Sequence, residues 1–518
     1  MDQNSTHQVT TAPEPEPEPD PRPRRGGLLS EQGWIFRDRV GDSSIPWAVL
    51  TIVCGVSLIA EMGSFVAAPM AGVIGTALHL TPSDAQWATL APLLVSAATT
   101  ALLAKVGDLF GHRRVLLWIL ALQLLGNVIT ATATGLPQLI IGRALVGLAA
   151  SQGLTLAILR DRTPVATQRR GVGMISGIQG IGIAPSFMIG GAFLASGAPW
   201  SSVFWFGGAL NLIALVGAFF FMPETVTRLK VKLDWKGALG LAIFLGLIDV
   251  AFSQSSAWGR TDPKTLACFF GGIAGAVIWW NYQTRTKSDP LIHPSLLRDR
   301  RLLPTFLSAA CMAFSAFTCY IGVSNFAEVP HKIAGYGFSA SVLAAGAILI
   351  PASLAMGLTG GFVGGIVNRS GARNISIVGL CGLTVVFLFW WQFHSNVWFF
   401  LIGGLLFGPS LMFSFTSTFS VVLTQAPRDS VATVSSMLQI IEGIGSNIGT
   451  AVFVAFITAR FIPGTPISVE SGYSNLFLTT ACVLILGILF ALMIPRNVAK
   501  GGFDEEEVVH VTPAGVVE

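Results

Sequence analysis

Two short stretches of sequence decide the fold: residues 104–114 read AKVGDLFGHRR, and residues 364–373 read GGIVNRSGAR. Three residues of each stretch match at a constant offset of 260: Asp108, Gly111 and Arg113 correspond to Asn368, Gly371 and Arg373. The same offset relates Ser176, Gln179 and Ser186 to Ser436, Gln439 and Ser446. A constant offset between matching apolar segments indicates an internal duplication of the chain.

The composition around these stretches argues for a membrane protein. Of the 518 residues, 52% are hydrophobic and 11% are charged, against roughly 25% charged in an average soluble protein. Soluble enzymes, nucleic-acid binders and secreted disulfide scaffolds are therefore excluded. An apolar run of about 20 residues can cross the hydrocarbon core as a helix. We predict fourteen such spans, at 47–76, 85–106, 114–134, 136–159, 171–197, 200–222, 237–255, 265–281, 303–327, 338–366, 374–392, 396–422, 431–459 and 474–495.

The basic residues predict how the spans are oriented. If the N-terminus lies in the cytoplasm, 26 of the 31 lysines and arginines fall on the cytoplasmic side and four outside, with Arg143 inside a span. Such a bias is typical of multi-pass membrane proteins. We therefore expect a multi-pass protein of the cell inner (cytoplasmic) membrane with both termini in the cytoplasm. No apolar segment typical of a signal peptide precedes the first span.

The duplication divides the chain into two six-helix bundles. The fold class is an all-α polytopic membrane protein whose two bundles are separated by an inserted pair of helices, spans 7 and 8. Paired halves of this kind are typical of secondary transporters. The predicted regions are a disordered cytoplasmic tail (1–45), the N-terminal bundle (46–225), the inserted helices with their linkers (226–301), the C-terminal bundle (302–497) and a second cytoplasmic tail (498–518).

The chain resembles the major facilitator superfamily, and specifically its fourteen-span drug:proton antiporter branch, over roughly residues 46–497. The family's loop pattern Gly-x-x-x-Asp-Arg-x-Gly-Arg-Lys/Arg is matched by Asp108, Gly111, Arg113 and Arg114, whereas Ala104 and Leu109 depart from it. By resemblance, this loop is a conformational switch that clasps the two halves. Its second copy contains Asn368, Arg369 and Gly371, and we expect a weaker clasp there because Asn368 replaces the acid.

Two further motifs lie inside spans. Arg143-x-x-x-Gly147 in span 4 resembles the superfamily pattern Arg-x-x-Gln-Gly, with Val146 in place of Gln. In span 5 the residues that resemble the antiporter motif Gly-x-x-x-Gly-Pro-x-x-Gly-Gly are Gly180, Ala184, Pro185, Gly190 and Gly191. Ala184 replaces the second Gly of that motif, and the final glycine pair lies two residues late.

Charged residues inside spans are the candidates for the transport mechanism, because burying a charge in a bilayer is costly. Glu61, eight residues before Pro69 in span 1, resembles the branch's span-1 acid. It can bind a proton or a cationic substrate, or it can be a structural acid paired with Arg143. Arg143 can modulate the proton affinity of Glu61, or it can simply bind helix carbonyl groups.

The second half offers a further acid and several polar residues. Glu442, near the middle of span 13, can be a second proton or cation site or can form a bond between helices. Gln179, Gln439 and Ser446 can line the cavity, although polar bonds between helices explain the two glutamines equally well. Asp249 belongs to the inserted helices, so we favour an interfacial pairing for it.

These features predict a proton-coupled efflux transporter for amphipathic, often cationic, compounds that works by alternating access. The alternatives are a narrow exporter of one endogenous metabolite, lipid or peptide, and a non-transporting membrane sensor or enzyme. We expect no enzymatic activity, no cofactor and no ATP site. The partners would be substrate, protons and membrane lipids, with no nucleic acid, and the protein would be a monomer. The six cysteines all lie in apolar runs and predict neither a disulfide nor a metal site.

Overall fold

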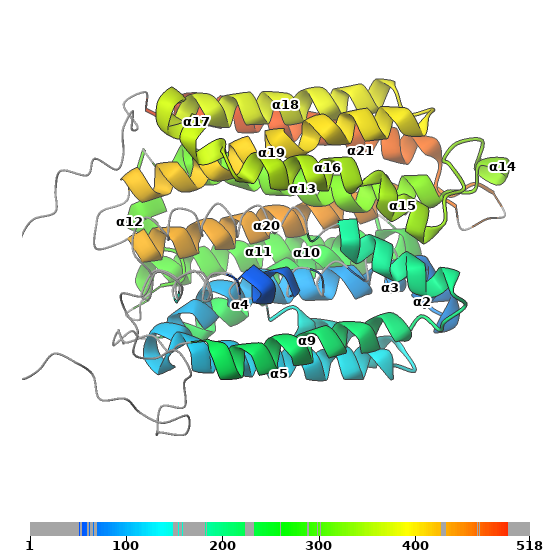
Figure 1. Cartoon of the computed structure of the whole chain (residues 1–518), viewed down its shortest axis with the longest axis horizontal. Coiled ribbons are helices and arrows are strands. Elements are labelled where there is room, and N and C mark those ends of the chain that lie inside the picture. Colours follow the sequence, from blue (N-terminus) through cyan, green and yellow to red (C-terminus); the bar gives the residue numbers. More distant parts are fainter. Residues whose placement is uncertain are drawn as a thin grey trace, which may run out of the picture.

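A computed structural model gives the fold of the chain. It describes residues 51, 54–59, 62, 66, 70–148, 154, 158, 182, 184–222, 233–259, 261–286, 290–297, 299–300, 302–425, 431–463, 465 and 467–495. Within these residues the regular structure is helical, apart from one isolated β-bridge between Phe461 and Ser468. The long helices run side by side along the long axis of the molecule (Figure 1). The predicted all-α fold is confirmed.

The helices of the first half follow the order of the predicted spans. They are α2 (Ala71–Ala77), α3 (Pro82–Ala85), α4 (Trp87–Phe110), α5 (His112–Ala131), α6 (Leu136–Val146), an unlabelled helix Ala184–Ala195, and α9 (Ser202–Phe221). The inserted pair comprises α10 (Trp235–Trp258) and α11 (Pro263–Arg285), which pack against each other.

The second half follows the short α12 (Pro294–Leu297). Its helices are α13 (Leu303–Glu328), α14 (His331–Ala334), α15 (Val342–Ile348), α16 (Ile350–Gly360), α17 (Val363–Ser370), α18 (Ala372–Gln392), α19 (Val397–Gln425), α20 (Val431–Ile457) and α21 (Glu470–Met493). Predicted span 10 is therefore divided into α15, α16 and α17. Pro351 lies in the first turn of α16, where its missing N–H and its ring favour a new helix start.

Ten helices of the described residues are long and apolar enough to cross a membrane, and three shorter apolar helices lie among them. Large apolar side chains on the outer faces are exposed, including Trp118 on α5, Ile213 on α9 and Ile278 on α11. Such faces suit a lipid environment, where apolar surface need not be hidden from water. The chain is thus a multi-pass membrane protein; the count of fourteen spans and the domain boundaries stay predictions.

The two halves pack in matching ways. Helix α5 packs on α9 in the first half, and α18 packs on α21 in the second. Figure 1 shows α5 and α9 at one side of the bundle and α18, α19 and α21 at the other, with α4, α13 and α20 between them. Helix α4 packs directly on α20, and the inserted α10 packs on both. We call this contact between α4, α10 and α20 the seam.

Candidate functional site

The seam is formed by apolar side chains from all three helices. Ala98 and Leu102 of α4 share one buried cluster with Leu241 of α10 and with Val434 and Leu438 of α20. A second contact joins the halves where helix Ala184–Ala195 meets α15. The helices that carry the candidate site are thus those that must move past one another if the halves rock.

Two glycines bring α20 close to α13. A side chain added at Gly445 would collide with the backbone of Ala310, and one added at Gly449 would collide with the backbone of Phe314. The four-residue spacing places both glycines on one face of α20. This close approach fixes how α20 is rotated, and therefore where its polar residues lie.

Glu442 lies on α20, the helix that packs on both α4 and α13, and it is half-buried. Its Oε1 atom is fully enclosed and has no hydrogen-bond partner. The Ser446 hydroxyl donates to the backbone oxygen of Glu442 at 2.9 Å, so the described bond of Ser446 is to its own helix. Gln439 lies one turn earlier and is half-buried. Among the described residues, Glu442 is thus an acid at mid-span whose carboxylate is incompletely satisfied.

Arg143 on α6 is completely buried and completes the hydrogen bonding of α4. Its Nε donates to the Ala88 carbonyl at 2.8 Å. In a regular helix that carbonyl would accept from residue 92, but residue 92 is a proline inside α4 and has no N–H. The guanidinium carbon also lies 5.7 Å from the centre of the Phe204 ring. The described contacts of Arg143 therefore include the helix-carbonyl interaction that the sequence offered as one alternative.

The loop of the predicted conformational switch forms a turn at Gly111. Its φ of 100° and ψ of 129° suit glycine alone. The His112 ring lies 3.1 Å from the Asp108 carboxylate, and Arg113 Nη2 donates to the Phe219 carbonyl at 2.5 Å. These two contacts lie within the first half, and Arg114 is exposed.

The second copy of this turn has the same geometry. Gly371 has φ 84° and ψ 138°. Arg373 Nη2 donates to the Leu492 carbonyl at 2.7 Å, as Arg113 does to Phe219. In both halves a cation thus neutralises the C-terminal carbonyls of the sixth helix, where the helix dipole is negative. Arg369 is exposed, and the Asn368 side chain lies outside the described residues.

The helix that carries the antiporter-like motif packs against the second half. The Ala184 backbone N–H donates to the Ser353 hydroxyl of α16 at 3.3 Å. Gly191 lies so close to the Leu343 backbone of α15 that no side chain would fit there. Gly190 is buried and Pro185 is half-buried. This motif region therefore lies at a contact between the halves.

Several predicted residues fall outside the described part of the chain. They are Glu61, Gln179 and Gly180, together with the two tails, 1–45 and 498–518. No group of metal ligands lies among the described residues. All six cysteines are within the described residues and are free thiols.

Two buried acids lie at or within the inserted helix α10: Asp234, which the sequence did not single out, and Asp249, for which we favoured an interfacial pairing. Asp234 caps α10 and accepts bonds from the Gly237 N–H (2.8 Å), the Tyr282 hydroxyl (2.9 Å) and Gln283 Nε2 (2.8 Å). Asp249 is also completely buried, but within the part of the chain that the structure describes neither of its oxygens has a hydrogen-bond partner. The cap position of Asp234 before an apolar run was a usable signal, whereas the burial of Asp249 depends on helix packing.

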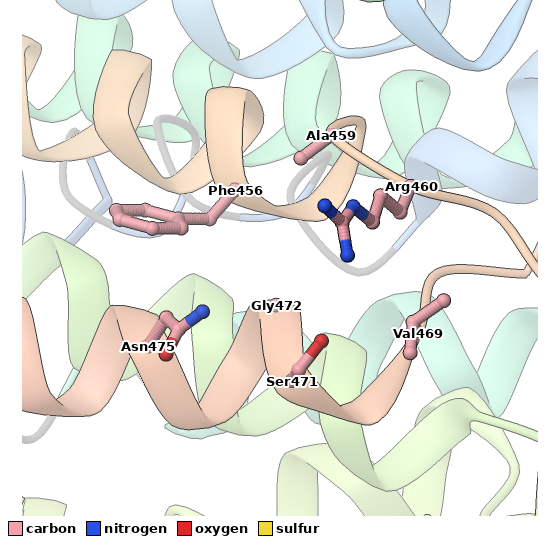
Figure 2. Close-up of a pocket in the computed structure, with 7 residues that line it drawn as sticks. All are labelled: Phe456, Ala459, Arg460, Val469, Ser471, Gly472 and Asn475. Atoms are coloured by element: carbon pink, nitrogen blue, oxygen red, sulfur yellow. The ribbon is translucent and has the colours of Figure 1, made fainter.

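A surface pocket lies away from these residues, between the end of α20 and the start of α21 (Figure 2). Phe456, Ala459, Arg460, Val469, Ser471, Gly472 and Asn475 line it. Figure 2 shows the Arg460 guanidinium directed into the space between the two helices. None of the predicted site residues contributes to this pocket.

The helical architecture defines the class as a multi-pass membrane protein, and comparison with known proteins gives the family. The model of the Major Facilitator Superfamily matches residues 53–450. The chain therefore belongs to the Major Facilitator Superfamily, and the resemblance seen in the sequence is confirmed.

Similar proteins include one named for resistance and export and one named for multidrug resistance. The chain is 27% identical over 437 residues to the tetracenomycin C resistance and export protein of Streptomyces glaucescens, covering 80% of this chain and 76% of that protein. It is 25% identical over 374 residues to the multidrug resistance protein Stp of Mycobacterium tuberculosis, covering 71% and 67%. The fold matches the crystal structure of the nucleoside transporter NupG with a TM-score of 0.60 and 14% identity, covering 86% of this chain and 100% of that one.

Proposed function

We propose that this chain exports amphipathic, often cationic compounds across the cytoplasmic membrane in exchange for protons. In this account the two halves rock about the seam, and the central site opens to one side at a time. Both termini would lie in the cytoplasm, so that export runs from the Gly111 and Gly371 turns toward the α2–α3 end. We expect a monomer that needs no cofactor, because the proton gradient drives the exchange.

The observation that carries the proposal is the position of Glu442. Placing a carboxylate at mid-span is costly, so its presence indicates a functional role. Among the described residues, one oxygen of Glu442 is enclosed without a hydrogen-bond partner. The residue lies on the helix that contacts both α13 and the first-half helix α4. A proton bound there would change the charge of the helix on which the halves meet. Glu442 is therefore suited to couple protonation to rocking.

Arg143 has a different part in this proposal. Its bond to the Ala88 carbonyl repairs the gap left by Pro92 in α4. A rigid α4 helps to transmit rocking, because α4 packs on α20 at the seam. A further effect of Arg143 on the proton affinity of Glu61 remains part of the proposal, and Glu61 lies outside the described residues.

Breadth of substrate is tested by expression in an efflux-deficient bacterial host. We expect increased tolerance to several unrelated cationic dyes, and loss of this tolerance when the proton gradient is collapsed. Protection against one compound alone would favour a narrow exporter. The name of the Streptomyces glaucescens relative refers to a single compound, which supports keeping that alternative.

Proton coupling is tested with purified protein in liposomes. A dye identified in the host assay should drive proton movement in the wild type. We expect Glu442→Gln and Glu61→Gln each to lower that movement at least tenfold. The control is Asp262→Asn, a half-exposed helix cap at the start of α11, where asparagine caps equally well. Normal proton movement in both glutamine variants would contradict the proposal.

A further inference from the structure

A second acid in the seam lies on the inserted helix rather than in either half. Asp249 of α10 and Asn447 of α20 are both 0% exposed. The Asn447 amide is the polar side chain that interacts with the Asp249 carboxyl. Both carboxyl oxygens and both polar amide atoms nevertheless lack a hydrogen-bond partner of good geometry. Two facing polar groups are therefore completely buried and incompletely satisfied.

An ionised carboxylate does not suit this environment. Burying a charge without a countercharge is far more costly than burying a neutral polar group. An ionised Asp249 could only accept hydrogen bonds, and Asn447 could satisfy it through Nδ2 alone. A protonated carboxyl has an O–H that can donate to Asn447 Oδ1 and a carbonyl oxygen that can accept from Nδ2. The amide thus complements the protonated acid at both of its polar atoms.

The charged residues on the surrounding elements lie at other levels of the bundle. They are Lys236 on α10 itself, Glu442 on α20, Lys105 and Asp108 on α4, Asp84 on α3, and Lys264 and Arg285 on α11. Glu442 is five residues from Asn447, or about 7.5 Å along the helix. Lys105 Nζ donates a hydrogen bond to the Pro290 carbonyl oxygen at 3.0 Å. Within the described residues, no cation forms an ion pair with Asp249.

Further polar side chains lie between Asp249 and the α3 end of the molecule. Ser253 lies one turn further along the same face of α10 and is completely buried. The next residue, Gln254, donates through Nε2 to the Asp84 carboxylate at 2.9 Å. Asp84 also accepts from the Thr81 hydroxyl at 2.7 Å, and Thr81 is exposed. The bonded group of Gln254, Asp84 and Thr81 thus lies between the level of Asp249 and the end of the bundle where α2 and α3 lie (Figure 1).

We propose that Asp249 and Asn447 form a proton-binding site between the inserted helix α10 and α20, which exchanges protons with water at the α3 end. Binding forms an O–H bond on one carboxyl oxygen with a proton taken from water and removes the negative charge. No other reactant is needed. Because α10 packs on α4 as well as α20, the state of this site bears on the seam directly. The proposal concerns the proton alone and does not depend on which compound is exported.

The test is infrared difference spectroscopy of the full chain in phospholipid nanodiscs, with aspartate labelled by carbon-13 at the side-chain carboxyl. The label separates aspartic acid bands from those of glutamic acid. We expect a protonated-aspartate band at neutral pH in the wild type, its loss in Asp249→Asn, and its retention in Asp262→Asn. Absence of this band from the wild type, or an unchanged band in Asp249→Asn, would overturn the proposal.

Two further arms make the result decisive. Asn447→Leu keeps the acid but removes its partner, so we expect the band to move to higher frequency as a hydrogen bond is lost. An unmoved band would overturn the pairing, and this arm remains informative if Asp249→Asn does not fold. Sodium chloride is then added at constant pH. An unchanged band supports a proton as occupant, whereas loss of the band would assign the site to the metal cation instead.

Discussion

The start and the middle of the inserted helix α10 show two ways of burying the same side chain. Asp234 at the start of α10 and Asp249 near its middle are both almost inaccessible. Asp234 accepts three hydrogen bonds from α10 and α11, whereas neither oxygen of Asp249 is satisfied. A satisfied buried carboxylate contributes to structure, because its donors would be stranded without it. An unsatisfied one lowers stability, so its presence indicates a role in function.

The same contrast holds for two further charged residues inside the helices, Arg143 on α6 and Glu442 on α20. Arg143 resembles Asp234, since it supplies the hydrogen bond that Pro92 removes from the Ala88 carbonyl. Glu442 resembles Asp249, since part of its carboxylate is enclosed and unsatisfied. Substitution of Asp234 or Arg143 should therefore lower the stability of the protein. Substitution of Asp249 or Glu442 should change proton binding with little loss of stability.

The largest effect on stability is expected at Asp234. Asp234→Leu leaves the Gly237 N–H, the Tyr282 hydroxyl and Gln283 Nε2 without their acceptor, at a cost of about 3–5 kcal/mol. The measurement is unfolding in detergent micelles. Asp234→Asn should lose less, because asparagine still caps a helix. Equal stability of Asp234→Leu and wild type would contradict the claim that Asp234 stabilises the fold.

A smaller loss is expected at Arg143. Arg143→Leu leaves the Ala88 carbonyl without a donor, which costs about 1–3 kcal/mol. The matched background is Pro92→Ala, which restores an N–H that can bond the same carbonyl. If the account is right, Arg143→Leu costs distinctly less in that background. Additive losses in the double variant would mean that Arg143 stabilises the protein through other contacts.

The smallest effect on stability is expected at Asp249, where the change should be near zero or of opposite sign. The double variant Asp249→Leu/Asn447→Leu removes both unsatisfied polar groups from the buried site, and replacing both partners by apolar groups of similar size is often neutral or stabilising. We expect the free energy of unfolding to change by less than about 1 kcal/mol, or to rise. A loss comparable to that of Asp234→Leu would show that Asp249 is a structural acid after all.

The parts of the fold that the sequence predicts are those set by local pattern. The offset of 260 residues identified two turns, and the structure gives Gly111 and Gly371 nearly the same backbone angles. The apolar runs located the helices, because length and hydropathy are local properties. The division of span 10 was missed, although Pro351 was a usable signal for it.

The site was less predictable because its chemistry depends on contacts between distant segments. The sequence placed Arg143 inside a span, but its Ala88 partner follows from how α6 lies against α4. For Asp249 the sequence favoured an interfacial pairing but could not name the partner, because the proximity of Asn447 follows from how α10 packs on α20. The partners of Glu442 were unpredictable for the same reason, since glycines 445 and 449 set the rotation of α20 against α13.

The central claim is that Glu442 carries the coupled proton, and a split between two transport assays tests it most directly. Liposomes containing Glu442→Gln or wild type are measured for exchange of labelled for unlabelled substrate without a gradient, and for accumulation driven by a pH gradient. The account predicts that Glu442→Gln keeps exchange near the wild-type rate, keeps its thermal midpoint, and loses gradient-driven accumulation. Accumulation at the wild-type level in Glu442→Gln would contradict it.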